Sequence, residues 1–146
     1  MFIGNFQHNI DDNGRFCIPA QFREELGENF VAVKGDVGFV VFFPTSEFNK
    51  RCSALHGSTP EAKALLYNYM TSSHQMVQDK QGRAVIPAAL RNYADITQTV
   101  YIVGMVDQIF VSAKILDNEQ YTPRDMYYHS EEALEKKEQK RLLEAL

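Results

Sequence analysis

The sequence predicts an α+β fold in which two pseudo-symmetric, β-rich halves are joined by helices and followed by a C-terminal helix. The first observation is an internal repeat: residues 11–24 read DDNGRFCIPAQFRE, and residues 79–92 read DKQGRAVIPAALRN. The second is that β-branched and aromatic runs follow both copies, and the third is that helix-forming residues separate them. A constant displacement (79 − 11 = 68) aligns the identical positions Asp11/Asp79, Gly14/Gly82, Arg15/Arg83, Ile18/Ile86, Pro19/Pro87, Ala20/Ala88 and Arg23/Arg91.

Each half is expected to begin with a strand, a turn, a second strand and a short helix. Residues 2–10 alternate apolar and polar side chains, as a half-buried strand does. The DDNG segment is a turn because Asp and Asn bond their own backbone and Gly accepts a positive φ. Pro19 lacks the donor that a strand needs, so it ends the second strand and starts a helix that stops near Gly27. The second copy repeats this order.

Two more strands are expected in each half, at residues 30–35 and 38–44 and at residues 99–104 and 108–113. Between the halves, residues 45–72 have helical character, with Thr45 and Thr59 as candidate N-caps. From about Arg124, leucines among alternating charges predict an amphipathic helix. The expected division is a first module at residues 1–52, a helical connector at 53–73, a second module at 74–120 and a helical tail at 121–146.

One half of this kind is too small to bury both faces of its own sheet. We therefore expect the two halves to bury their faces against each other. Such pairing places the repeated turns at equivalent positions on one surface, as in a homodimer that uses one patch twice.

Composition indicates a globular protein without a membrane segment. The 146 residues are 45% apolar, and neither a charged lead nor an apolar run of about 18 residues is present. A cytoplasmic location is therefore expected. Cys17 and Cys52 form no CxxC motif, so we interpret them as two buried free thiols. The net charge of −4 weakly disfavours nucleic acid, but many of the acids lie in the last quarter of the chain.

Arg15 and Arg83 are the main candidates for function. A guanidinium offers a planar fork of donors that matches guanine O6 and N7 or grips a phosphate. The alternative is a solvated turn arginine paired with the nearby aspartate. Recurrence at the same step of two symmetric turns favours DNA contact.

The aspartates and glycines of the turns are expected to be structural. Asp11 and Asp79 can accept backbone donors and orient the arginine four residues on, while Gly14 and Gly82 permit the turn. A hydrolytic carboxylate pair would need a separation of roughly 5–10 Å and a pocket, so no enzyme activity is expected.

Metal and cofactor sites are not expected. The glycines form neither GxxxxGKT nor GxGxxG, and the histidines (His8, His56, His74 and His129) lack metal-ligand spacing. The aromatic residues Phe39, Phe42, Phe43, Tyr67 and Tyr69 lack interleaved basic residues, which favours core or subunit-interface packing over base stacking.

The segments IDDNGRFCIPAQFREELG and QDKQGRAVIPAALRNYA, with the opening MFIGNFQHNIDD, resemble the MraZ family of bacterial regulators. The resemblance covers residues 1 to about 120. It implies two fused SpoVT-AbrB-type, swapped-hairpin modules that form a β-barrel-like core. It also implies that the arginines of the two D-x-x-x-R motifs contact DNA, from Asp11 to Arg15 and from Asp79 to Arg83.

The resemblance further implies a ring-like homo-oligomer, often of about eight subunits, in which linked turns raise the effective concentration. Such a ring is expected to bind short direct repeats of double-stranded DNA upstream of a cell-division and cell-wall gene cluster, at the nucleoid. Asn13, Gln81 and Gln21 stand where the family often has Lys, although Lys80 lies beside Gln81. Lys80 and Asn13 complete the candidate DNA contacts, and we expect the two turns to contact DNA unequally.

The sequence therefore predicts a sequence-specific DNA-binding transcriptional regulator without a small-molecule substrate. The alternative is a protein-interaction module, antitoxin-like or a scaffold, that uses the same fold. Loss of Arg15 and Arg83 would leave the partner binding of such a module intact.

Overall fold

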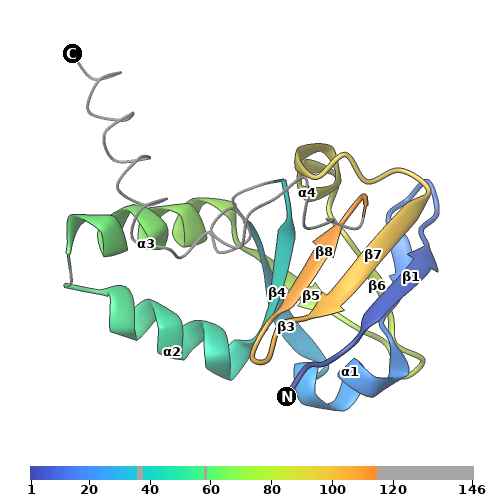
Figure 1. Cartoon of the computed structure of the whole chain (residues 1–146), viewed down its shortest axis with the longest axis horizontal. Coiled ribbons are helices and arrows are strands. Elements are labelled where there is room, and N and C mark those ends of the chain that lie inside the picture. The colour runs from blue at the N-terminus through green and yellow to red at the C-terminus, as the bar shows by residue number, and fades with distance from the viewer. Residues whose placement is uncertain (36–37, 58, 115–146) are drawn as a thin grey trace.

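The computed structural model describes residues 1–35, 38–57 and 59–114 (Figure 1). The predicted order of elements is confirmed within these ranges, whereas the expected helical tail at residues 121–146 lies outside them. The first half contains β1 (Asn5–Asn9), β2 (Arg15–Cys17), α1 (Ala20–Leu26), β3 (Asn29–Lys34) and β4 (Val40–Pro44). The helices α2 (Thr45–Leu55) and α3 (Pro60–Ser72) follow. The second half contains β5 (His74–Val77), β6 (Arg83–Val85), α4 (Ala88–Tyr93), β7 (Thr99–Gly104) and β8 (Ile109–Ser112).

The strands of the two halves interleave. A six-stranded sheet has the order β1-β7-β8-β4-β3-β5, so each edge strand pairs with a strand of the other half. A separate two-stranded ribbon joins β2 to β6. All pairings are antiparallel. The halves therefore share both sheets rather than only packing face to face.

The pairing pattern has pseudo-twofold symmetry. The β1–β7 pair corresponds to the β5–β3 pair, and the β3–β4 hairpin corresponds to the β7–β8 hairpin. The β2–β6 ribbon lies on the axis, because its central partners, Phe16 and Ala84, are themselves equivalent in the repeat (84 − 16 = 68). The fold is α+β and compatible with the AbrB-like double-module arrangement. The six-stranded sheet of the described residues stays open, with β1 and β5 at its edges.

Alternation along the central strands divides the core between the two faces of the sheet. In β3 and β4, Phe30, Ala32, Val40 and Phe42 pack with the ribbon and with α1 and α4, whereas the intervening residues pack against α2 and α3. Both faces of these strands are buried, which explains their continuous apolar runs. Figure 1 shows α2 and α3 together on one side of the sheet and the β2–β6 ribbon on the other.

The connecting helices begin where the sequence predicts, but only one of them has the expected cap. The Thr59 hydroxyl oxygen accepts the Ala62 N–H at 3.2 Å, as predicted. Thr45 is instead the first residue of α2, and its hydroxyl donates to the Asn29 carbonyl at 3.1 Å. Pro44 occupies the N-cap without a side-chain bond. Thr45 thus ties the helix to the start of β3 rather than capping it.

The prediction that both cysteines are buried is wrong. Cys17 is exposed and Cys52 is partly buried, and both are free thiols. Cys17 lies between Phe16 and Ile18, which both face the core, so the alternation of the strand turns its side chain outward. No helix among the described residues is long and apolar enough to span a membrane.

Candidate nucleic-acid interface

The two DxxxR segments form the same turn. In the first, Asp11 Oδ1 accepts the backbone N–H groups of Asn13 and Arg15, each at 2.9 Å. In the second, Asp79 Oδ1 accepts those of Gln81 and Arg83, also at 2.9 Å. A backbone bond from the glycine N–H to the aspartate carbonyl, 3.0 Å in both copies, completes each turn. The turn glycines, Gly14 and Gly82, have φ of +86° and +78°, a conformation that disfavours a Cβ.

These hydrogen bonds favour the ionised form of both aspartates. The pKa of Asp11 is lowered mainly by the backbone N–H of Arg15. The pKa of Asp79 is lowered first by the backbone N–H of Arg83 and then by its guanidinium. The carboxylates therefore serve as acceptors that shape the turns.

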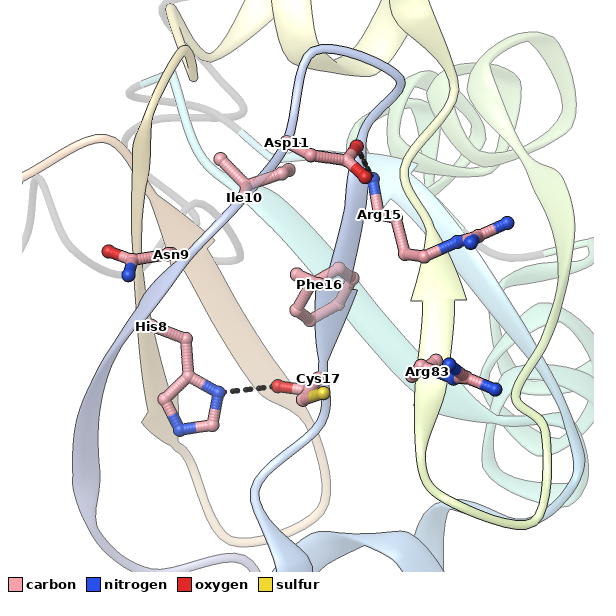
Figure 2. A pocket seen from close by; sticks show the side chains of 8 residues that line it. All are labelled: His8, Asn9, Ile10, Asp11, Arg15, Phe16, Cys17 and Arg83. Carbon is pink, nitrogen blue, oxygen red and sulfur yellow. Dashed lines mark hydrogen bonds between the residues drawn. The ribbon is translucent and has the colours of Figure 1, made fainter.

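The ribbon carries both candidate arginines on its exposed face. Phe16 and Ala84 are buried, while their strand neighbours, including Arg15 and Arg83, are exposed. Arg15 lies opposite Val85, two residues from Arg83, so the arginines are diagonal neighbours across the pseudo-twofold axis. Diagonal neighbours in an antiparallel pair are roughly 7–8 Å apart. In Figure 2 their side chains extend in the same direction, from β2 and from β6.

The two arginines differ in how they are held. Arg83 Nε donates to Asp79 Oδ2 at 2.8 Å, and both side chains are about half exposed. No corresponding ion pair joins the described side chains of Arg15 and Asp11, and in Figure 2 the Arg15 guanidinium points away from that carboxylate. Lys80 and Asn13, the other predicted contacts, are exposed within the second and first turns. The first turn therefore presents a less restrained arginine, and the second adds a lysine.

The repeat also contains a second pair of arginines, and each of these packs against the turn of the other half. Arg91 Nε donates to the Ile86 carbonyl at 2.9 Å, and its Nη1 donates to the Asp12 carbonyl of the first turn at 3.2 Å. Arg23 Nε donates to the Ile18 carbonyl at 2.8 Å. A Cβ on Gly14 would lie 2.6 Å from Arg91 Nε. The alignment of Arg23 with Arg91 in the repeat identified this pair in the sequence, but it did not predict what the two side chains contact.

Each arginine accompanies a backbone bond between the halves. The Ile18 N–H donates to the Gly82 carbonyl at 2.8 Å, and the Ile86 N–H donates to the Gly14 carbonyl at 2.9 Å. A Cβ on Gly82 would lie 2.0 Å from Arg23 Nε. Both turns are therefore in direct contact with the opposite half of the chain.

A buried glutamine adds a restraint to the second turn only. Gln78 is 6% exposed, and its Nε2 donates to the carbonyls of Arg23 and Gly27, each at 2.8 Å. The equivalent position in the first half is the apolar Ile10 (78 − 68 = 10). Gln78 was not predicted as important, and its departure from the repeat was the signal that could have identified it.

An open groove adjoins the arginines (Figure 2). Its volume is ≈ 550 Å³. His8 Nδ1 donates to the Cys17 carbonyl at 2.5 Å, which links the edge strand β1 to the ribbon. The groove therefore brings polar groups of β1 beside the exposed face of the ribbon. Its lining residues are His8, Asn9, Ile10, Asp11, Arg15, Phe16, Cys17 and Arg83.

The remaining predicted residues lie away from this face or within the core. Phe39, Phe42, Phe43 and Tyr69 are buried, whereas Tyr67 is 64% exposed on α3. The ranges 1–35, 38–57 and 59–114 contain no group of three or more His, Cys, Asp or Glu side chains that could hold a metal ion.

Comparison with known proteins gives a consistent family. A family model described as "MraZ protein, putative antitoxin-like" matches residues 1–67 and 70–143 and so spans both turns. A protein named "Transcriptional regulator MraZ" from Desulfitobacterium hafniense is 34% identical over 138 residues, which are 92% of this chain and 96% of that protein. A protein of the same name from Syntrophomonas wolfei is 36% identical over 108 residues, 72% of this chain and 76% of that protein. One from Corynebacterium jeikeium is 37% identical over 112 residues, 75% of this chain and 78% of that protein.

Proposed function

The chain belongs to the MraZ family of transcriptional regulators, and from that premise we propose that it binds double-stranded DNA through the exposed face of the β2–β6 ribbon. In this proposal Arg15 and Arg83 make the principal contacts, and Lys80 and Asn13 add contacts at the turns. The protein acts in the cytoplasm, at the nucleoid. Binding requires no metal, cofactor or small-molecule substrate.

The observation that carries the proposal is the position of the arginines on the ribbon. Arg15 and Arg83 are exposed on one face of a two-stranded antiparallel ribbon, on either side of its pseudo-twofold axis. The major groove of B-DNA, about 12 Å wide, admits such a ribbon, and β-ribbon proteins use strands in this way. Arginine is the residue that most often contacts guanine O6 and N7. This arrangement supports base contact as well as phosphate contact.

Several copies of the ribbon are needed for tight binding. One ribbon with its two turns presents Arg15, Arg83 and Lys80, and the whole chain has a net charge of −4. A ring-like homo-oligomer, as expected from the family, presents many ribbons in register with short direct repeats upstream of the protein's own operon, in the division and cell-wall cluster. Linked sites raise the effective concentration, so that weak single contacts sum to a useful affinity.

A protein-interaction module is the competing function. The family description contains the words "antitoxin-like", which fits a module that holds a protein partner. The exposed ribbon would then be incidental to partner binding. Variants that lack both arginines distinguish the two functions.

The test is fluorescence anisotropy with DNA from upstream of the protein's own gene, across a salt series. If about 4–8 phosphates are neutralised per assembly, log K falls with log[salt] at a slope of roughly −4 to −7. Arg15→Ala and Arg83→Ala each weaken binding, and the double variant weakens it further. Equal binding to scrambled DNA, or an unchanged affinity of the double variant, would reject the proposal.

A further inference from the structure

We propose that Arg23 and Arg91 are positioning residues that hold the DNA-contact turn of the opposite half. Arg91, in the second half, sets the first turn and thereby Arg15. Arg23, in the first half, sets the second turn and thereby Arg83. The effect on DNA binding rests on the proposed function, whereas the effect on the turns does not.

The first turn is held by two contacts from the second half. Arg91 Nη1 donates to the Asp12 carbonyl at 3.2 Å, and the Ile86 N–H donates to the Gly14 carbonyl at 2.9 Å. Arg91 Nε is itself fixed by the Ile86 carbonyl at 2.9 Å. One guanidinium thus connects the strand end at Ile86 to the tip of the first turn. The planar fork of arginine makes both bonds at once, which a lysine ammonium on a flexible stem does not reproduce.

The second turn has the twofold-related contacts, except that no hydrogen bond joins the Arg23 guanidinium to the described residues of this turn. Arg23 Nε donates to the Ile18 carbonyl at 2.8 Å, and the Ile18 N–H donates to the Gly82 carbonyl at 2.8 Å. Only a glycine at position 82 leaves room for this guanidinium. Gln78 holds the backbone of Arg23 in addition, and Arg83 is paired with Asp79. The second turn therefore has more restraints that do not depend on the arginine opposite.

This geometry separates a positioning role from direct DNA contact. Arg23 and Arg91 are only partly exposed, and the Nε of each is committed to a backbone carbonyl of its own half. Arg15 and Arg83 lie on the exposed face of the ribbon. The consequence is a crossed dependence, in which each half controls the arginine that the other half presents. Because the second turn has further restraints, the dependence is stronger for Arg91 than for Arg23.

The test uses charge-retaining variants in matched backgrounds. Arg91→Lys and Arg23→Lys are each placed in the wild-type chain, in Arg15→Ala and in Arg83→Ala, and binding to the upstream DNA is measured by anisotropy. Loss of one charged hydrogen bond predicts an affinity loss of about tenfold for Arg91→Lys. That loss persists in the Arg83→Ala background and falls below about twofold in Arg15→Ala, because non-additivity marks residues that act together. For Arg23→Lys the affinity loss is smaller; it persists in the Arg15→Ala background and falls below about twofold in Arg83→Ala.

Amide hydrogen exchange without DNA gives an independent readout. Arg91→Lys speeds exchange of the Arg15 N–H, and Arg23→Lys speeds that of the Arg83 N–H, while exchange of Phe42 in the core strand β4 is unchanged. Faster exchange at Phe42 identifies a global loss of stability, and Arg91→Gln, which keeps an amide NH2 donor group, then replaces the lysine variant.

Two outcomes would overturn the positioning role of the arginines, and a third would reject the proposed function. Equal affinity losses in both backgrounds would show that Arg91 does not act through Arg15 and would overturn the positioning role. Unchanged turn exchange in both lysine variants would also overturn it. Wild-type protein that fails to bind DNA would reject the proposed function alone, since the exchange experiment still tests the turns.

Discussion

Replacing Gly14 by alanine tests the contact between the halves most sharply. Two costs are expected. The first is the positive φ of +86°, which disfavours a Cβ by about 1–2 kcal/mol. The second is steric, because the new Cβ would lie 2.5 Å from the Ile86 carbonyl oxygen and 2.6 Å from Arg91 Nε. The carbonyl belongs to the backbone, so the turn has to move and its bonds to the second half are lost.

The magnitude follows from these bonds. The backbone bond from Ile86 contributes about 0.5–1.5 kcal/mol, and a hydrogen bond from a charged group contributes about 1.5–3 kcal/mol. Alanine also lowers the entropy of the unfolded chain, which stabilises the folded state by about 0.4–1 kcal/mol. We expect Gly14→Ala to lower the free energy of unfolding by about 2–6 kcal/mol.

Gly57 and Gly82 provide matched controls. Gly57 has φ of +73°, and a Cβ there meets nothing within 4 Å among the described residues, so Gly57→Ala bears only the conformational cost of about 1 kcal/mol. Gly82→Ala displaces the flexible side chain of Arg23 and falls between the other two. The assay is urea unfolding at one fixed protein concentration. Equal losses for Gly14→Ala and Gly57→Ala, within about 0.5 kcal/mol, would refute the packing of Arg91 against the first turn.

Three further predictions concern the turns, the α2 helix and the cysteines. The pKa values of Asp11 and Asp79 lie below the ordinary value of 3.8. The stability that these two carboxylates give the fold is therefore complete above that pH and is lost as pH falls through the lowered values. The urea midpoint should fall on acidification, and the Asp11→Ala/Asp79→Ala double variant should show a weaker dependence of the midpoint on pH. Arg51→Leu removes two carboxylate partners and a cation–π contact and should cost about 1–3 kcal/mol in urea unfolding, whereas an unchanged midpoint would contradict these contacts. Cys17 should react with a thiol reagent before Cys52, because Cys17 is exposed and burial raises the pKa of the Cys52 thiol; equal rates would contradict the burial difference.

Local elements were predictable because their signals are local. Gly14 and Gly82 marked the turns, Pro19 and Pro87 marked the strand ends, and the apolar runs marked the central strands. Each of these residues acts on its own φ, its own donor or its own burial. The residues that determine each of these features lie within a few positions of one another in the sequence.

The pairing of strands across the halves was not predictable in the same way. Alternation predicts that β1 has a buried and an exposed face, but it does not say that its partner is β7 rather than a strand of its own half. The repeat indicated symmetry, and symmetry permits either arrangement. The choice depends on which edges meet, and that is a property of the folded chain.

The exposure of Cys17 and the contacts of Arg23 and Arg91 differ in how far they follow from the sequence. Phe16 and Ile18 already implied that Cys17 faces outward, so its exposure was available from alternation. The roles of Arg23 and Arg91 were not available, because each contacts a turn far away in the sequence. Their alignment within the repeat indicated a shared role without identifying it.

The most direct test of the central claim is a footprint on DNA upstream of the protein's own gene, with wild-type protein and with the Arg15→Ala/Arg83→Ala double variant. If the β2–β6 ribbon binds DNA, wild-type protein protects regularly spaced short repeats and the folded double variant protects none of them. Protection by the double variant equal to that of wild type, or no protection by wild type, would contradict the claim that the β2–β6 ribbon binds DNA.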